Sequence, residues 1–172
     1  TNAAGTVALG NGGVTDGWGI NIGAPNTIVG GTVAGSGNVI TGNHAAGILI
    51  DAGPLVLNGD ASNNLIQGNL IGTTAAGTAG IGNAGEGILI NAANNVIGGT
   101  TVGARNVIAW NGSAGIFLTE TASGNSVKGN YIGTDITGLV ALGNAEEGVG
   151  IGGGVLNTIG GATAADRNVI TG

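Results

Sequence analysis

The 172-residue chain contains no cysteine and no methionine, and aromatic residues make up only 2% of it. Without cysteine there can be no disulfides, so the fold must be stabilised by packing and hydrogen bonds. Charged residues amount to 7%, and only Arg105, Lys128 and Arg167 are basic, against nine acidic residues. Nucleic-acid binding needs clustered cations, which a chain of net charge −6 with three basic residues does not supply. No apolar run approaches the ~20 residues of a membrane-spanning helix.

What the chain does contain is glycine, at 40 positions, together with 42% hydrophobic residues and a mean hydropathy of +0.40. That much aliphatic content excludes a disordered chain. The glycines show no three-residue period with proline, which excludes collagen. The composition therefore indicates a folded protein that bends often.

Three short patterns each recur five times, always in the same order. The first is glycine–apolar–any–aliphatic, at 17–20, 47–50, 87–90, 115–118 and 148–151. The second is N-x-[I/V]-x-G, at 26–30, 64–68, 95–99, 125–129 and 157–161. The third is N-x-I, at 38–40, 69–71, 106–108, 130–132 and 168–170. Short segments bounded by Gly or Asn are typical of brief β-strands separated by turns.

Three strands per cycle of about thirty residues cannot bury a core as hairpins, but a continuously coiling chain can do so. Equivalent strands would then stack about 4.8 Å apart into parallel sheets. The sequence thus predicts an all-β, single-stranded parallel β-helix of about five three-strand coils. The predicted aliphatic core consists of two axial columns: Ile28, Ile66, Ile97, Val127 and Ile159, and Ile40, Ile71, Ile108, Ile132 and Ile170.

Gly and Asn at the bends have a physical reason, because they adopt positive φ at the lowest cost. Stacked asparagines can also pass amide hydrogen bonds along the axis as a ladder. The predicted corner ladders are Asn26, Asn64, Asn95, Asn125 and Asn157, and Asn38, Asn69, Asn106, Asn130 and Asn168.

The connections alternate in length, so the single domain divides into two unit types. Units 1–42, 73–110 and 134–172 carry the longer connections, and units 43–72 and 111–133 the shorter ones. The chain begins and stops within a repeat and shows no charged cap. We therefore expect a segment of a longer repeat protein or a filament subunit that self-associates end to end.

These motifs resemble the parallel β-helix repeat family of the pectate-lyase-like superfamily. The likeness is closest to the Gly/Asn-rich repeats (N-V-I-x-x-N, G-N-x-I-G-T, G-N-x-x-E-G) of large secreted bacterial surface proteins, and it covers the whole chain. The resemblance implies right-handed coiling and an extracellular or cell-surface location. It does not fix a function, because the same scaffold carries lyases, adhesins and inert stalks.

The residues that could carry catalysis repeat with the coils. Asp16, Glu86 and Glu147 precede the glycine of the first pattern in alternate units, and Arg105 and Arg167 precede the asparagine of the third. Repeated placement favours a structural role over a catalytic carboxylate pair or a catalytic base. Coils two apart would also hold carboxylates about 10 Å from one another, too far to clamp one ion.

His44 is the only histidine, which cannot build a zinc site. We therefore expect no enzyme activity, no cofactor and no metal. Ice binding would need a regular array of threonines on one sheet. The outward positions of the second pattern are not such an array, because they hold Thr27, Leu65, Val96, Ser126 and Thr158.

A stripe of apolar residues precedes the aliphatic residue of the third pattern: Val39, Leu70, Val107, Tyr131 and Val169. Strand alternation should turn this stripe outward. Either the long connections fold over it or a neighbouring solenoid covers it in lateral self-association, and both stay open here. Trp110 is a candidate glycan contact, and Asn111 begins an N-G-S glycosylation sequon on a predicted surface turn.

The sequence thus favours a non-enzymatic extracellular structural protein: the stiff shaft of a surface stalk, filament or adhesin. The alternative is a β-helix module that binds or cleaves polysaccharides.

Overall fold

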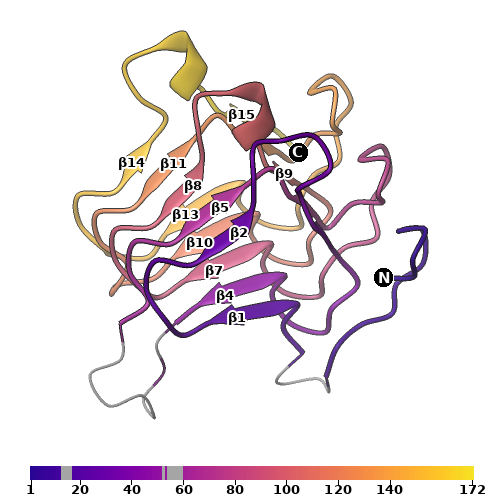
Figure 1. Ribbon diagram of the computed structural model, residues 1–172, viewed down its shortest axis with the longest axis horizontal. Helices are drawn as coiled ribbons and strands as arrows, with labels where there is room; N and C mark the ends of the chain where they lie inside the picture. Colours follow the sequence, from indigo (N-terminus) through magenta and orange to yellow (C-terminus); the bar gives the residue numbers. More distant parts are fainter. Residues whose placement is uncertain (13–16, 52, 54–59) are drawn as a thin grey trace.

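The computed structural model describes residues 1–12, 17–51, 53 and 60–172, and its strands lie in three parallel sheets of five strands each (Figure 1). Sheet A contains β1 (Ile20–Ile22), β4 (Ile48–Ile50), β7 (Ile88–Ile90), β10 (Ile116–Leu118) and β13 (Val149–Ile151). Sheet B contains β2 (Ile28–Gly30), β5 (Leu65–Gln67), β8 (Val96–Gly98), β11 (Ser126–Lys128) and β14 (Thr158–Ile159). Sheet C contains β3 (Val39–Ile40), β6 (Leu70–Ile71), β9 (Val107–Ile108), β12 (Tyr131–Ile132) and β15 (Val169–Ile170).

The chain visits sheets A, B and C in turn and then starts the next coil, so that each strand pairs with its equivalent one coil away. This is the predicted parallel β-solenoid of five coils. Its interior is a single aliphatic cluster, because each strand turns only its alternate residues inward. The fully buried side chains at its centre include Ile48, Ile50, Ile66, Ile71, Ile88, Ile90, Ile97, Ile108, Ile116, Leu118, Val127 and Ile132.

The predicted core column of sheet B is wrong at its first member. Ile28 pairs with Leu65 and leaves 66% of its surface exposed, whereas Val29 pairs with Ile66 and is buried. The segment Thr27-Ile28-Val29 offers two adjacent β-branched residues, so the motif alone does not say which of them points inward.

The turn before this strand decides the register. Asn26 has φ 58°, as do the turn residues Asn63 (58°) and Asn94 (59°), which stand one residue before their ladder asparagines. Asn26 is therefore a bend residue and not a ladder member, and Thr27 takes the ladder position. The corrected register makes the spacing regular: 11 residues separate Val29 from Ile40, just as they separate Ile97 from Ile108.

The first strand also differs from the motif assignment. Ile20 pairs with Ile48 and Ile22 with Ile50, so the first coil's equivalent of 47–50 is 19–22 rather than 17–20. The glycine–apolar–any–aliphatic pattern fits both segments, but only the second turns two isoleucines toward the core.

The last coil keeps the register of the columns but not their burial. Ile159 pairs with Val127 and Ile170 with Ile132, yet they are 37% and 47% exposed. Strands β14 and β15 each have a neighbour on one side only. The remaining predicted members of the two columns are buried.

Two kinds of connection project from the coils. Residues 1–9, 73–81 and 134–142 form three arms, each closed by a hydrogen bond of the Thr74 N to Ala79 O type. The arms touch one another, because Ala75 N donates to Gly5 O (3.0 Å) and Ile136 N donates to Gly77 O (2.9 Å). Residues 31–37, 99–105 and 161–167 form three short loops, two of which contain the 3₁₀ turns η1 (Val102–Ala104) and η2 (Ala164–Asp166).

Among the described residues, none belongs to a helix with the length and apolar character needed to cross a membrane.

Candidate functional site: asparagine ladders and an apolar groove

The asparagines that open sheet C form a continuous ladder. Asn38 donates its backbone N–H and its Nδ2 to Oδ1 of Asn69, at 3.0 and 2.9 Å. The same pair of hydrogen bonds, from N and Nδ2 to one Oδ1, joins Asn69 to Asn106, Asn106 to Asn130 and Asn130 to Asn168. This ladder matches the sequence prediction residue for residue, and every step runs in the same direction along the axis.

The ladder beside sheet B relies mainly on backbone donors. Asn64 N donates to Asn95 Oδ1 (2.9 Å), and the next steps lead to Asn125 (2.8 Å) and Asn157 (2.9 Å). Thr27 N donates to Asn64 Oδ1 at 2.7 Å and so begins the column in place of Asn26.

A third ladder, which the sequence analysis missed, runs beside the arms. Its members are Asn11, Asn43, Asn83, Asn111 and Asn144, joined from backbone N to Oδ1 at 3.4, 3.2, 3.3 and 3.1 Å. The signal was present in the sequence: four of these asparagines stand four residues before the glycine that opens a sheet A strand.

Membership of this ladder changes the interpretation of the N-G-S sequon. Asn111 is only 2% exposed, and its Nδ2 donates to Ala109 O and to Asn144 Oδ1. Glycosylation would modify that nitrogen, so the folded structure does not present it on a surface turn as predicted.

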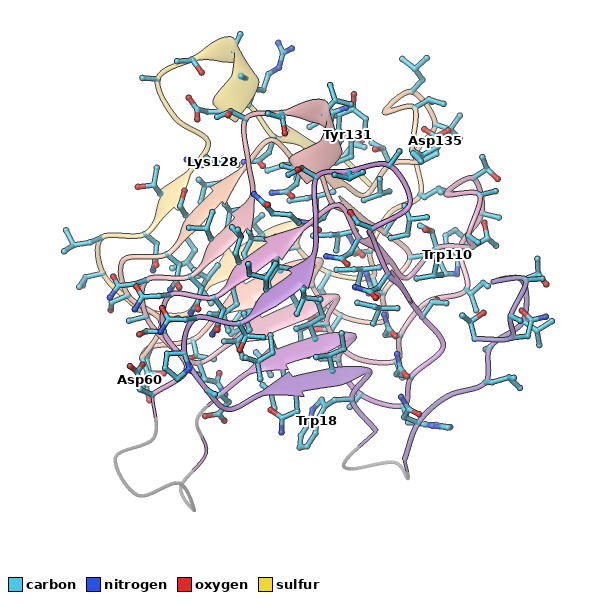
Figure 2. All side chains as sticks on the ribbon, viewed as in Figure 1. Trp18, Asp60, Trp110, Lys128, Tyr131 and Asp135 are labelled. Carbon is cyan, nitrogen blue, oxygen red and sulfur yellow. The ribbon has the colours of Figure 1, made fainter. Side chains whose placement is uncertain are left out.

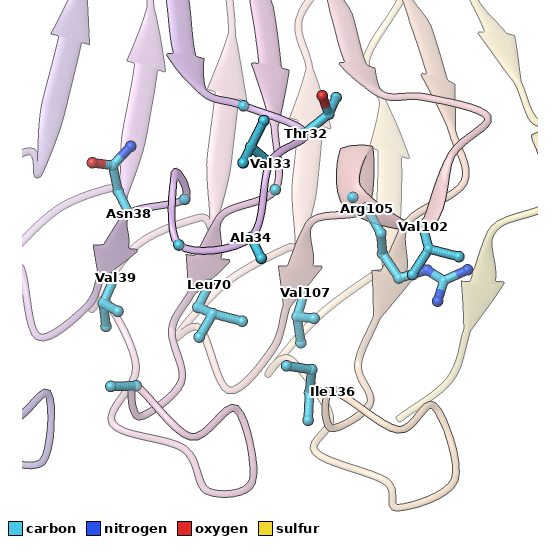
Figure 3. A pocket seen from close by; sticks show the side chains of 16 residues that line it. Thr32, Val33, Ala34, Asn38, Val39, Leu70, Val102, Arg105, Val107 and Ile136 are labelled. Atoms are coloured by element: carbon cyan, nitrogen blue, oxygen red, sulfur yellow. The ribbon is translucent and has the colours of Figure 1, made fainter.

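The apolar stripe lies on the outer side of sheet C, where neighbouring strands place its members in register. Val107 is buried and the other four are partly buried. Above Val39, Leu70 and Val107 is an open groove of about 510 Å³ (Figure 3). Its floor is therefore aliphatic and belongs to three successive coils.

The connections supply the walls of this groove. One wall is the short loop 31–37 together with η1, and the other is formed by Ala75 and Ile136 from two arms. The long connections thus shield the stripe from the sides but do not close over it. The prediction that the long connections fold over the stripe is therefore met only at its edges. The alternative, that a neighbouring solenoid covers the stripe, stays a prediction.

Arg105 lies at one end of the groove. Its guanidinium stands 3.9 Å from the centroid of the Tyr131 ring, and its Nε donates to Gly129 O (3.2 Å). This cation–π contact holds the side chain against the floor. A smaller hollow of about 250 Å³ continues beyond it, lined by Arg105, Tyr131 and the exposed Arg167. No carboxylate lines either hollow.

Trp110 lies outside the groove, on the arm side of the molecule (Figure 2). It adopts φ 61° and is 55% exposed. A Cβ on Gly80 would overlap its ring, so the indole packs directly against the arm 73–81. One face of the ring is thereby occupied, which leaves less of it free to stack on a sugar.

Of the three recurring acids, Asp16 lies outside the described residues. In the described ranges there is no group of three or more His, Cys, Asp or Glu side chains placed to hold a metal ion. Glu86 and Glu147 hold equivalent backbone positions, as predicted, because Gly47 N donates to Glu86 O and Gly115 N donates to Glu147 O. Their carboxylates do not meet at one partner: Ser113 Oγ donates to Glu86 (3.5 Å) and to Glu146 (2.6 Å).

Two aspartates have perturbed acidity for structural reasons. The Thr137 hydroxyl, followed by the backbone N–H groups of Val140 and Leu139, lowers the pKa of Asp135 below its usual value. The hydroxyl and N–H of Thr163 likewise lower the pKa of Asp166. Both carboxylates brace their own connection, which is a capping role.

Comparisons with models of protein families, with curated proteins and with solved structures found no match.

Proposed function

We propose that the protein is a non-enzymatic structural element, the stiff shaft of an extracellular stalk, filament or adhesin. The observation that carries the proposal is the set of three asparagine ladders, which run in parallel with three sheets through successive coils. Axial hydrogen bonds at six places around the coil resist bending and stretching together. The likeness of the repeats to those of secreted surface proteins supports the extracellular location.

Native-state hydrogen exchange and fibre diffraction test this function. A shaft should show slow exchange across β4 to β12, and concentrated samples should give an axial reflection near 4.8 Å. Fast exchange throughout these strands would contradict the proposal. Cleavage of an acidic or neutral polysaccharide, or glycan binding that is lost in Trp110→Ala, would replace it with the polysaccharide alternative.

A further inference from the structure

We propose that the turn 153–156 of one molecule docks into the sheet C groove of a second copy, with Leu156 as the inserted side chain. This inference rests on the proposed structural function and adds to it a lateral contact between shafts.

Leu156 occupies a position that other coils give to Asn or Gly. The equivalent residues Asn26, Asn63, Asn94 and Gly124 all have positive φ, and Leu156 has φ 60°. A left-handed backbone is unfavourable for a branched aliphatic residue, because its Cβ crowds the following carbonyl oxygen, and asparagine and glycine largely avoid this cost. Strain at one repeat position alone is a reason to look for a function there.

The Leu156 side chain gains nothing from the fold in return, because it is 86% exposed. Its exposure belongs to the corner and not to its place in the last coil, since Asn63 and Asn94 are also exposed in interior coils. Val155 beside it is 63% exposed. The turn is thus a small apolar projection maintained at a cost.

The groove has the complementary form. Its floor of Val39, Leu70 and Val107 is recessed between two walls, so a flat surface cannot reach it and a projecting side chain can. Its volume of about 510 Å³ can accommodate two aliphatic side chains of the size of Val155 and Leu156.

The charges favour the same pairing. The corner that joins sheets A and B carries the exposed Asp60 and Glu120, and no Lys or Arg stands among its described residues 60–63, 91–94, 119–124 and 152–157. Glu120 is adjacent to the projecting turn, since a Cβ on Gly153 would lie 3.4 Å from the Glu120 Cβ. The groove, in contrast, has Arg105 at one end, Arg167 lines the smaller hollow beyond it, and no acid lines either hollow. Complementary charge of this kind fixes the orientation of docking.

The two surfaces also lie on opposite sides of one molecule. The corner between sheets A and B faces away from sheet C, with the turn before β14 at one side of Figure 1 and the arms at the other. A contact between different surfaces is heterologous and leaves one of each free on every pair. Repetition of it would align shafts side by side in an open array.

Sedimentation velocity over a range of protein concentrations, on the whole chain, tests the proposal. Leu156→Asn restores the residue type of the other corners and should weaken self-association about ten- to hundredfold. Val33→Asp/Val102→Asp places acids on two exposed rim residues of the groove and should weaken it similarly. Leu139→Asn is the matched control, because Leu139 is 87% exposed on an arm and does not line the groove. This variant should self-associate as the wild type does.

A mixture of the two deficient variants gives the decisive measurement. Leu156→Asn keeps an intact groove and Val33→Asp/Val102→Asp keeps an intact turn, so together they should form a one-to-one pair and no larger species. Added salt should weaken that pair. A wild type that stays monomeric, or variants that each associate normally, would overturn the inference. A wild-type monomer whose groove binds a fatty acid would also overturn the docking inference. The shaft function is tested separately, because slow hydrogen exchange in β4 to β12 would support it even if the docking inference failed.

Discussion

Truncation of one interior ladder residue should destabilise the protein far more than truncation of a residue at the ladder's end. The side chain of Asn106 is 0% exposed and makes four hydrogen bonds. Its Nδ2 donates to Ile66 O (2.8 Å) and Asn130 Oδ1 (3.0 Å), and its Oδ1 accepts from N (3.0 Å) and Nδ2 (3.1 Å) of Asn69.

The cost of Asn106→Ala follows from which partners are left unsatisfied. Asn69 Nδ2 keeps Val29 O and Gln67 O, and Asn130 Oδ1 keeps the Asn106 backbone N–H. The buried Asn69 N–H, however, loses its acceptor, and such a group costs about 1–3 kcal/mol. With about 1 kcal/mol more for the lost bond to Ile66 O, the free energy of unfolding should fall by about 2–4 kcal/mol.

Asn38→Ala is the matched control on the same ladder. Asn38 is exposed, and its side chain makes one hydrogen bond, from Nδ2 to Asn69 Oδ1 at 2.9 Å. The same truncation there should cost less than about 1 kcal/mol. Urea unfolding followed by circular dichroism measures both. Equal losses for the two variants would refute the view that the buried ladder holds the coils together.

Three further outcomes are expected. Val29→Thr should lower the free energy of unfolding by about 1–3 kcal/mol because it buries a hydroxyl, whereas Ile28→Thr on the outer face should change it by less than about 0.5 kcal/mol in the same urea assay. A carbon-13 titration should place the pKa of Asp135 below the ordinary value, so its stabilising contribution is complete above about pH 3.9 and is lost as the pH falls through the folded-state pKa; Thr137→Val should move that pKa upward. Folded protein offered to an oligosaccharyltransferase should stay unmodified at Asn111 by mass spectrometry, while an unfolded peptide of the same segment is an acceptor.

The repeat pattern was sufficient to predict the solenoid, its coil number and one complete ladder. The pattern failed where two adjacent residues could fill the core position, as at Ile28 and Val29. The register there depends on which corner residue adopts positive φ, and the motif contains no information on that. The groove could not be predicted, because its walls are formed by connections. The sequence gives the lengths of these connections, but their directions depend on packing. The third ladder was within reach, because Asn83 and its equivalents recur at a fixed distance from a glycine.

The alternation of long and short units has a structural consequence that a single unit type could not produce. Equivalent strands two coils apart are separated by about 10 Å, yet Ile136 N reaches Gly77 O at 2.9 Å, so the arms lean together along the axis. The short units between them turn tightly at Gly68 and Gly129, both with positive φ, and add no wall of their own. Long connections on every coil would therefore crowd the face of sheet C, and short ones throughout would leave it flat. Alternation instead leaves a recess above Leu70 with a wall on each side, which is the shape that a projecting turn can enter.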